Sequence, residues 1–225
     1  MIIVTGASRG IGLSICRRLI EKGERVIGLA RSTKDLDFEG IDCDVGNYAS
    51  VKDASRTIRK MSGEVTSIIN AAGVASMNMA VTTDESTVQK LIQTNLVGTI
   101  YSCQLFAPIL IRQRSGSFIN FSTIAVALAL KGESVYAASK AGVEAFSRTF
   151  AREMADFNIR VNCIAPGPIQ TDLLRGITDL QIKKITSQQI IQKQFEKEDV
   201  CDLVELLIDK KSASLSGQVL NVGGV

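Results

Sequence analysis

Short apolar runs alternate with longer amphipathic stretches along the whole 225-residue chain. Runs such as Met1–Val4 and Val26–Leu29 are continuously apolar rather than alternating, which is typical of strands that are buried on both faces. The stretches between them have the length and periodicity of helices. This alternation predicts an α/β fold in which a mainly parallel sheet has helices on both faces. Ligands bind such sheets beyond the carboxyl ends of the strands.

Seven strands and five long helices are expected. The strands are predicted at residues 2–5, 25–30, 40–43, 65–70, 117–122, 160–165 and 218–222, and the helices at 10–22, 48–61, 84–114, 135–156 and 197–209. Gly23 is placed to close the first helix, and Asn47 to cap the second. The length suits one domain over residues 1–225.

The composition excludes several classes of function. The chain has no histidine, which removes Ser-His-Asp and Cys-His catalysis, and its five cysteines are far apart, so we expect buried thiols and no metal site. Its net charge of +3 is scattered, which argues against nucleic acid as a partner. We see no signal peptide and no apolar run long enough to span a membrane, so we expect a cytoplasmic protein.

A glycine-rich turn follows the first strand. Its glycines are Gly6, Gly10 and Gly12, and a helical pattern begins within it. Bare backbone N–H groups at a helix N-terminus are suited to a pyrophosphate, which side chains would hold away. The spacing differs from the common G-x-G-x-x-G pattern but has the same physical logic. It predicts a Rossmann-type, doubly wound dinucleotide fold, with Ser8 and Ile11 also at the ligand.

The second strand ends where such folds place the residue that contacts the adenine ribose. An acid there favours NAD(H), whereas Arg31 occupies this position, and Arg9 lies within the glycine turn. Two guanidinium groups favour the 2′-phosphate of NADP(H). Asp35 and Asp37 follow closely and keep NAD(H) as an alternative.

Tyr136 and Lys140 lie four residues apart, which places a phenol and an ammonium group on one helix face. A nearby cation lowers the pKa of a phenol and makes it a usable acid or base. Tyr48 and Lys52 have the same spacing, so the spacing alone is weak. Only the helix of Tyr136 follows a strand that ends in hydroxyl residues, and we interpret Tyr48 as helix surface.

Taken together, the motifs resemble the short-chain dehydrogenase/reductase family, especially its 3-oxoacyl-(acyl carrier protein) reductase-like members. The resemblance covers nearly the whole chain and rests on the glycine turn, Asp44-Val45, Asn70-Ala71-Ala72-Gly73, Asn95, Ser122-Thr123, Tyr136-x3-Lys140 and the segment from Pro166 to Asp172. It implies a homodimer or homotetramer in which the helix of Tyr136 and the long helix before it form the dimer contact.

The resemblance also implies roles. Tyr136 would donate a proton to the substrate oxygen, Lys140 would lower its pKa and hold the nicotinamide ribose, and Asn95 would support a proton relay from a break in the long helix. The remaining cofactor contacts would be Asp44, Val45, Asn70, Ala71, Gly73, Pro166, Gly167, Ile169 and Thr171.

Two positions depart from the family pattern. Thr123 stands thirteen residues before Tyr136, where the family has its catalytic serine. Threonine keeps the hydroxyl but is stiffer at χ1. We therefore expect Thr123 to supply the catalytic hydroxyl, with Ser122 as a substitute, and turnover to be slower than is usual in the family. Ala71 replaces an asparagine, which removes a structural hydrogen bond.

We therefore predict NADPH-dependent reduction of a ketone, with a 3-oxoacyl thioester, a simple or steroid-like ketone and a sugar-derived ketone left open. A lid is expected over residues 172–193, where Leu173, Leu174, Ile177, Leu180 and Ile182 could contact an apolar substrate or form a buried stripe. The alternative is a catalytically idle dinucleotide-binding sensor or scaffold. Epimerase-type relatives are disfavoured by glycine spacing and domain size.

Overall fold

The computed structural model describes residues 1–171 and 178–225. Its centre is a seven-stranded sheet in the order β3-β2-β1-β4-β5-β6-β7, with every neighbouring pair parallel. The strands are β1 (Ile2–Thr5), β2 (Val26–Ala30), β3 (Gly40–Asp42), β4 (Ser67–Asn70), β5 (Gly116–Phe121), β6 (Ile159–Ala165) and β7 (Val219–Asn221). The predicted sheet is confirmed, with most strands a little shorter than expected.

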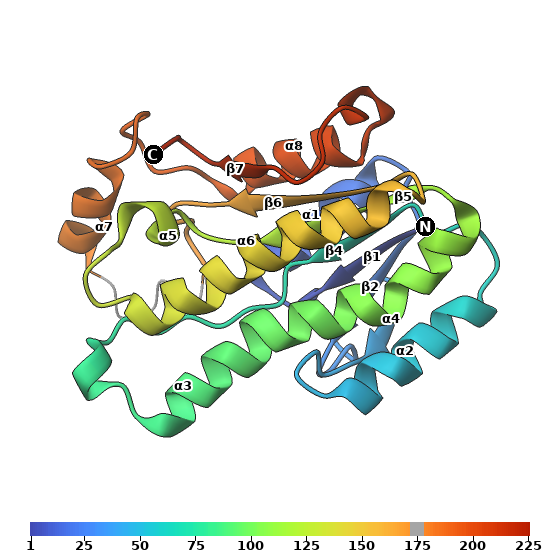
Figure 1. Cartoon of the computed structure of the whole chain (residues 1–225), viewed down its shortest axis with the longest axis horizontal. Coiled ribbons are helices and arrows are strands. Elements are labelled where there is room, and N and C mark those ends of the chain that lie inside the picture. The colour runs from blue at the N-terminus through green and yellow to red at the C-terminus, as the bar shows by residue number, and fades with distance from the viewer. Residues whose placement is uncertain (172–177) are drawn as a thin grey trace.

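Helices cover both faces of this sheet (Figure 1). The long helices are α1 (Gly10–Glu21), α2 (Tyr48–Lys60), α4 (Gly98–Gln113), α6 (Ser134–Ala155) and α8 (Lys197–Ile208), and the shorter ones are α3 (Glu85–Leu91), α5 (Ile124–Leu128) and α7 (Asp179–Thr186). Short 3₁₀ turns lie at Ala80–Thr82 and Lys210–Ser212. Gly23 has a φ of +84° after α1, and the Asn47 side chain accepts a hydrogen bond from the Ser50 N–H, so both predicted caps are confirmed.

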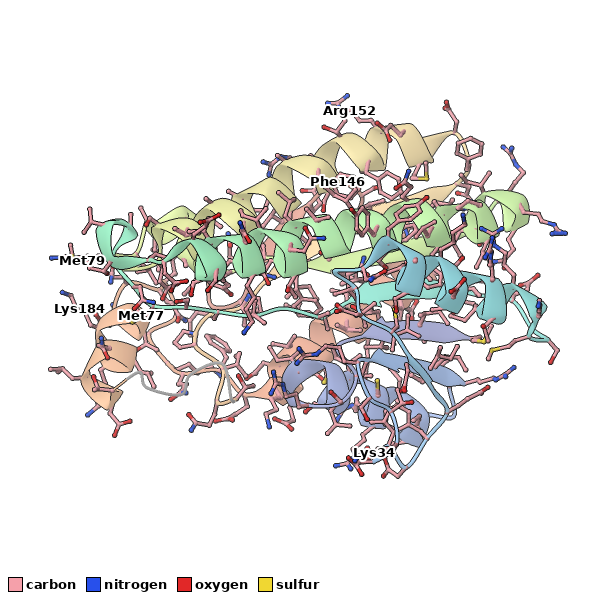
Figure 2. All side chains as sticks on the ribbon, turned by 90° about the horizontal axis from the view of Figure 1, so that it is seen from below. Lys34, Met77, Met79, Phe146, Arg152 and Lys184 are labelled. Atoms are coloured by element: carbon pink, nitrogen blue, oxygen red, sulfur yellow. The ribbon has the colours of Figure 1, made fainter. Side chains whose placement is uncertain are left out.

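Two hydrophobic cores separate the three layers. One core holds Phe106, Phe118 and Phe150, under α2, α4 and α6. The other holds Ile15, Leu19 and residues of α8 on the opposite face. In Figure 2, Phe146 lies on the α6 side, where its ring stacks on Phe150 with centroids 5.2 Å apart. Because both faces are covered, the central strands β1, β2 and β4 are buried throughout.

The predicted long helix is continuous from Glu85 to Gln113 but is not uniformly α-helical. Residues Ile92–Val97 form a π-helical segment between α3 and α4. By length and apolar composition this helix could cross a membrane, a test that core helices also pass. Cys103, Phe106 and Leu110 from its second half are buried in the protein core.

The strand order reverses beside β1, because β1 pairs with β2 on one side and with β4 on the other. After β1 the chain forms β2 and β3, which lead to one edge of the sheet. From β4 it forms β5, β6 and β7, which lead to the other edge. This is the switch point at which α/β sheets bind ligands, outside the carboxyl ends of the strands. The fold therefore places the glycine turn after β1 and the segment after β4 on either side of one crevice.

Close backbone packing at that crevice predicts that alanine substitutions at two glycines destabilise the protein by different amounts. A Cβ at Gly6 (φ +71°) would lie 2.7 Å from Ala72 Cα, whereas one at Gly23 (φ +84°) would contact nothing within 4 Å. Gly6→Ala should therefore lower the free energy of unfolding by about 2 kcal/mol or more, through strain and overlap, and Gly23→Ala by about 1 kcal/mol, through strain alone. Urea denaturation of both variants measures this, and equal losses would contradict it.

Candidate active site

A cavity of about 610 Å³ opens at the carboxyl edge of the sheet. It is lined by the turn between β1 and α1, the ends of β2 and β3, the segment after β4, the end of β5, the first turns of α6 and the segment after β6. Its volume lies in the usual range for small-molecule and cofactor sites. Segments from most of the chain thus meet at one cavity.

Most residues expected from the sequence line this cavity. They are Gly6, Ser8, Arg9, Gly10, Ile11, Gly12, Arg31, Asp44, Val45, Ala71, Gly73, Ser122, Thr123, Tyr136, Lys140, Pro166, Gly167, Ile169 and Thr171. Two expected residues, Asn70 and Asn95, are buried behind the wall instead. Neither side chain lines the cavity, so their predicted contacts stay untested.

The glycine turn has the geometry of a phosphate cradle. Gly6 and Gly10 have positive φ values of +71° and +58°, and a Cβ at Gly12 would overlap the Gly6 carbonyl oxygen. Side chains are therefore excluded where the backbone passes under the cavity, and α1 begins at Gly10 with its N-terminus at this turn. Backbone N–H groups and a helix dipole at one place fit the pyrophosphate of a dinucleotide.

Two guanidinium groups lie at the same end of the cavity. Arg9 belongs to the glycine turn and Arg31 follows β2, and both line the cavity. Asp35 and Asp37 do not line it, and the Asp37 carboxylate is 3.6 Å from the Arg17 guanidinium. The charge at this end of the cavity is therefore suited to a phosphate.

The first turns of α6 carry Tyr136 and Lys140. The Thr123 side chain, which follows β5, lies close enough to the Tyr136 hydroxyl to lower the pKa of the phenol. The Thr123 hydroxyl also accepts a hydrogen bond of 3.2 Å from the Ala125 N–H and so caps α5. Lys140 is buried, and its Nζ donates to the Phe121 carbonyl oxygen at 2.8 Å. The strand end thus orients the amine and places the Thr123 hydroxyl beside the phenol.

Desolvation moves the pKa values of these two groups in opposite directions. It raises the pKa of Tyr136 to about 12, with the Glu133 carboxylate raising it further and the Thr123 hydrogen bond opposing the rise. It lowers the pKa of Lys140 to about 8. We expected Lys140 to bring the pKa of Tyr136 toward neutrality, and this was wrong for the protein alone. Burial penalises the phenolate more than nearby groups stabilise it.

Asn95 is fully buried in the π-helical segment and bridges two parts of the site. Its Oδ1 accepts from the Val74 N–H at 2.9 Å, and its Nδ2 donates to the Val74 carbonyl at 2.9 Å and to Ser139 Oγ at 3.0 Å. The Ser139 hydroxyl then donates to the Tyr136 carbonyl at 2.7 Å. The break expected in the long helix is therefore present, and Asn95 fixes the segment after β4 to the helix of Tyr136.

Two side chains point elsewhere than the sequence suggested. Ser122 lines the cavity, but its hydroxyl donates to Glu144 Oε1 at 2.6 Å and is thereby directed to α6 rather than to Tyr136. The Asn70 amide donates to Asn120 Oδ1 at 2.7 Å in the interior, so its side chain does not line the cavity. Buried polar groups take the nearest hydrogen-bond partners, and spacing along the chain does not reveal those partners.

Tyr48, which matches the spacing of Tyr136, is on the surface as interpreted. Its side chain is 40% exposed and lies edge-on to the Tyr101 ring, with centroids 5.2 Å apart. It does not line the cavity. The five cysteines are buried, and burial raises their pKa values, which is consistent with the expected packing role.

Several cavity residues were not anticipated from the sequence. Glu133 precedes α6 and lies three residues before Tyr136, and Met77, Leu130 and Ile185 add apolar surface. The position of Glu133 one helical turn from Tyr136 was the available signal. For Met77 and Leu130 the sequence offers no periodic pattern, because they lie in irregular segments.

The expected lid is described only in part. Its residues Leu173, Leu174 and Ile177 lie outside the described residues. In α7, Ile182 and Ile185 are buried and Leu180 is 78% exposed. The Gln181 amide donates to Met77 Sδ at 3.7 Å, so α7 contacts the segment after β4. Figure 2 shows Met77, Met79 and Lys184 at this same end of the molecule.

A family model for short chain dehydrogenases matches residues 1–181. The 3-oxoacyl-[acyl-carrier-protein] reductase FabG of Staphylococcus epidermidis is 34% identical, with 99% of this chain and 96% of that protein covered. The FabG protein of Escherichia coli is 31% identical over 99% of this chain and 95% of its own length.

Solved structures show the same fold. The ligand-free aldohexose dehydrogenase of Thermoplasma acidophilum has a TM-score of 0.89 and 29% identity, and covers 99% of this chain and 92% of its own. The structure of gox2181 has a TM-score of 0.91 and 28% identity, with 98% and 93% covered. The sheet and its helices therefore follow a common plan over nearly the full length.

Proposed function

Because this chain belongs to the short-chain dehydrogenase family of NAD(P)-dependent oxidoreductases, we propose that it reduces a ketone to a secondary alcohol with NADPH. The observation that carries the proposal is that the Tyr136 and Thr123 hydroxyl groups line the same cavity as the glycine cradle, with Thr123 close enough to lower the pKa of Tyr136. Two hydroxyl groups there can hold one carbonyl oxygen. The bacterial relatives are named as 3-oxoacyl-[acyl-carrier-protein] reductases, which supports a 3-oxoacyl thioester as one candidate substrate.

When bound, the nicotinamide supplies the hydride. The cradle at Gly6, Gly10 and Gly12 would hold the pyrophosphate, and the N-terminus of α1 would stabilise its charge. Tyr136 and Thr123 donate hydrogen bonds to the ketone oxygen, and the negative charge that develops there is stabilised. The raised pKa of Tyr136 keeps its proton available for donation near neutral pH.

Lys140 acts on the charge that remains after this transfer. Tyr136 becomes a phenolate when it gives up its proton, and the Lys140 ammonium lies one helical turn away, four residues later in α6. Its cation stabilises the phenolate, while Asn95 and Ser139 hold the first turn of α6 in place. A proton then returns to Tyr136 from solvent.

The cofactor preference follows from charge. Arg9 and Arg31 line the end of the cavity where an acid would be needed to bind an unphosphorylated ribose.

We further propose a cytoplasmic homodimer or homotetramer in which α4 and α6 of two chains pair, and a lid over residues 172–193. Ala138 and Ala145 of α6 are exposed and small enough for close helix contact, whereas Gly142 packs against Leu96 of its own chain.

Replacing Tyr136 with phenylalanine tests the proposal directly. Tyr136→Phe removes the proton donor and should lower NADPH-dependent ketone reduction at least a hundredfold, while NADPH binding changes less than threefold. NADPH oxidation with a panel of ketones and fluorescence titration of the cofactor measure the two effects. Equal rates in both proteins would refute the proposal. NADPH binding without turnover of any ketone by the wild type would favour an idle sensor or scaffold.

Replacing Arg31 tests the cofactor preference. Arg31→Ala removes a charge-assisted hydrogen bond to the 2′-phosphate and should weaken NADPH binding about tenfold or more, with little change for NADH. Arg152→Ala, at an exposed position far along α6, is the matched control and should change neither affinity. Calorimetric titration with both nucleotides measures this. An equal loss for NADPH and NADH would contradict a role at the phosphate.

The pKa of Lys140 predicts the pH dependence of reduction. With a pKa of about 8, Lys140 is charged below that pH and neutral above it, whereas Tyr136 keeps its proton throughout this range. The kcat/KM for a ketone at saturating NADPH should therefore fall as pH rises through about 8. Lys140→Met should be slower and lack this inflection. A wild-type profile that stays flat between pH 7 and 10 would contradict the assignment.

A further inference from the structure

Glu133 is a buried carboxyl group in the cavity wall whose charge the proposed mechanism does not use. It is only 9% exposed, lines the cavity, and directly precedes α6. Within residues 1–171 and 178–225, no hydrogen bond or ion pair reaches its carboxylate. Although it is the N-cap residue of α6, its side chain makes no capping hydrogen bond. Buried carboxylates are normally paired, so an unpaired one that faces a cavity requires an explanation.

The neighbouring groups do not neutralise this carboxylate. Lys140 donates its hydrogen bond to the Phe121 carbonyl, and Lys131 is exposed at the surface. A Cβ at Gly132 would lie 3.6 Å from Met77 Cγ, so an apolar side chain packs beside the backbone that carries Glu133. Burial raises the pKa of Glu133, and the N-terminal dipole of α6 favours its ionised form. A hydrogen-bond donor entering the cavity would complete this site.

We propose that Glu133 binds a hydrogen-bond donor of the ketone substrate, either a hydroxyl or a protonated amine. Tyr136 holds the carbonyl oxygen and lies three residues after Glu133; both line the same cavity, and the Glu133 carboxylate is near enough to raise the pKa of Tyr136. The donor group must therefore lie a few bonds from the carbonyl carbon. This assignment rests on the proposed ketone reduction and narrows its substrate class. Anionic ketones are disfavoured, because they would place a second negative charge beside the first.

A matched set of six-membered ketones tests the assignment. The set is 4-methylcyclohexanone, 4-hydroxycyclohexanone, protonated 4-(dimethylamino)cyclohexanone and the anion 4-oxocyclohexanecarboxylate. With NADPH, the wild type should reduce at least one donor-bearing ketone with a kcat/KM about tenfold or more above that of the methyl compound, and should disfavour the anion. A higher rate for the hydroxyl or for the amine ketone identifies which donor the site takes. Equal kcat/KM values across all four ketones would overturn the proposal.

Two variants separate recognition from general damage to the protein. Glu133→Leu should remove the preference for either donor over the methyl compound, and Glu133→Gln should remove the preference for the amine while retaining part of that for the hydroxyl. Glu153→Gln, an exposed glutamate on the same helix, is the control and should leave all ratios unchanged. The ratios between substrates do not depend on the fraction of folded enzyme. Ratios that persist in Glu133→Leu would refute the role.

A binding measurement keeps this inference separate from the proposed activity. The alcohols 4-(dimethylamino)cyclohexanol, 4-hydroxycyclohexanol and 4-methylcyclohexanol are titrated calorimetrically into protein saturated with NADPH, where no reaction can occur. Tighter binding of a donor-bearing alcohol that is lost in Glu133→Leu supports the recognition site even if no ketone is turned over. Equal affinities for all three alcohols would overturn the site even if ketones are reduced.

Discussion

The buried amide of Asn95 is the interaction on which the geometry of the site depends. It joins the segment after β4 at Val74 to Ser139, and Ser139 in turn holds the Tyr136 carbonyl. The π-helical segment supplies the place for it, and the Asn95 carbonyl accepts from the Thr99 hydroxyl at 2.8 Å. One side chain therefore holds the segment after β4 against the helix of Tyr136. π-helical segments within α-helices are frequent at functional sites, which fits the place of this one beside the cavity.

Burial of the first turns of α6 then determines the chemistry. The same desolvation raises the pKa of Tyr136 and lowers that of Lys140, because it penalises whichever form is charged. A phenol that keeps its proton suits reduction, in which the protein must act as an acid. The negative charge of Glu133 raises the pKa of Tyr136 further and so helps the phenol to keep its proton. Unpaired burial of that carboxyl group has a cost, which binding of a donor group by the substrate offsets.

The sequence predicted the sheet, both helix layers and most of the cavity lining, because strand periodicity and the glycine turn are local patterns. That Tyr136 and Lys140 line one cavity was predictable from their helix spacing together with the hydroxyl residues that end the preceding strand, whereas their roles stay a prediction. The directions of Ser122 and Asn70 could not be predicted, since each is determined by a partner more than twenty residues away, Glu144 or Asn120. The pKa of Tyr136 was misjudged for a related reason. Burial depends on packing of the whole fold, whereas a neighbouring lysine is visible in the sequence.

Thr123 shows how tertiary structure changes the meaning of a substitution. Its branched side chain is stiff at χ1, which on its own suggested slower catalysis than a serine would give. The hydroxyl, however, caps α5 by accepting from the Ala125 N–H, and it lies close enough to Tyr136 to lower the pKa of the phenol. A backbone donor of the same chain thus already directs this hydroxyl. A side chain that is stiff at χ1 loses less rotamer entropy when its hydroxyl is held in place, so for the proposed reaction this effect opposes the slower turnover expected from the sequence, which stays a prediction.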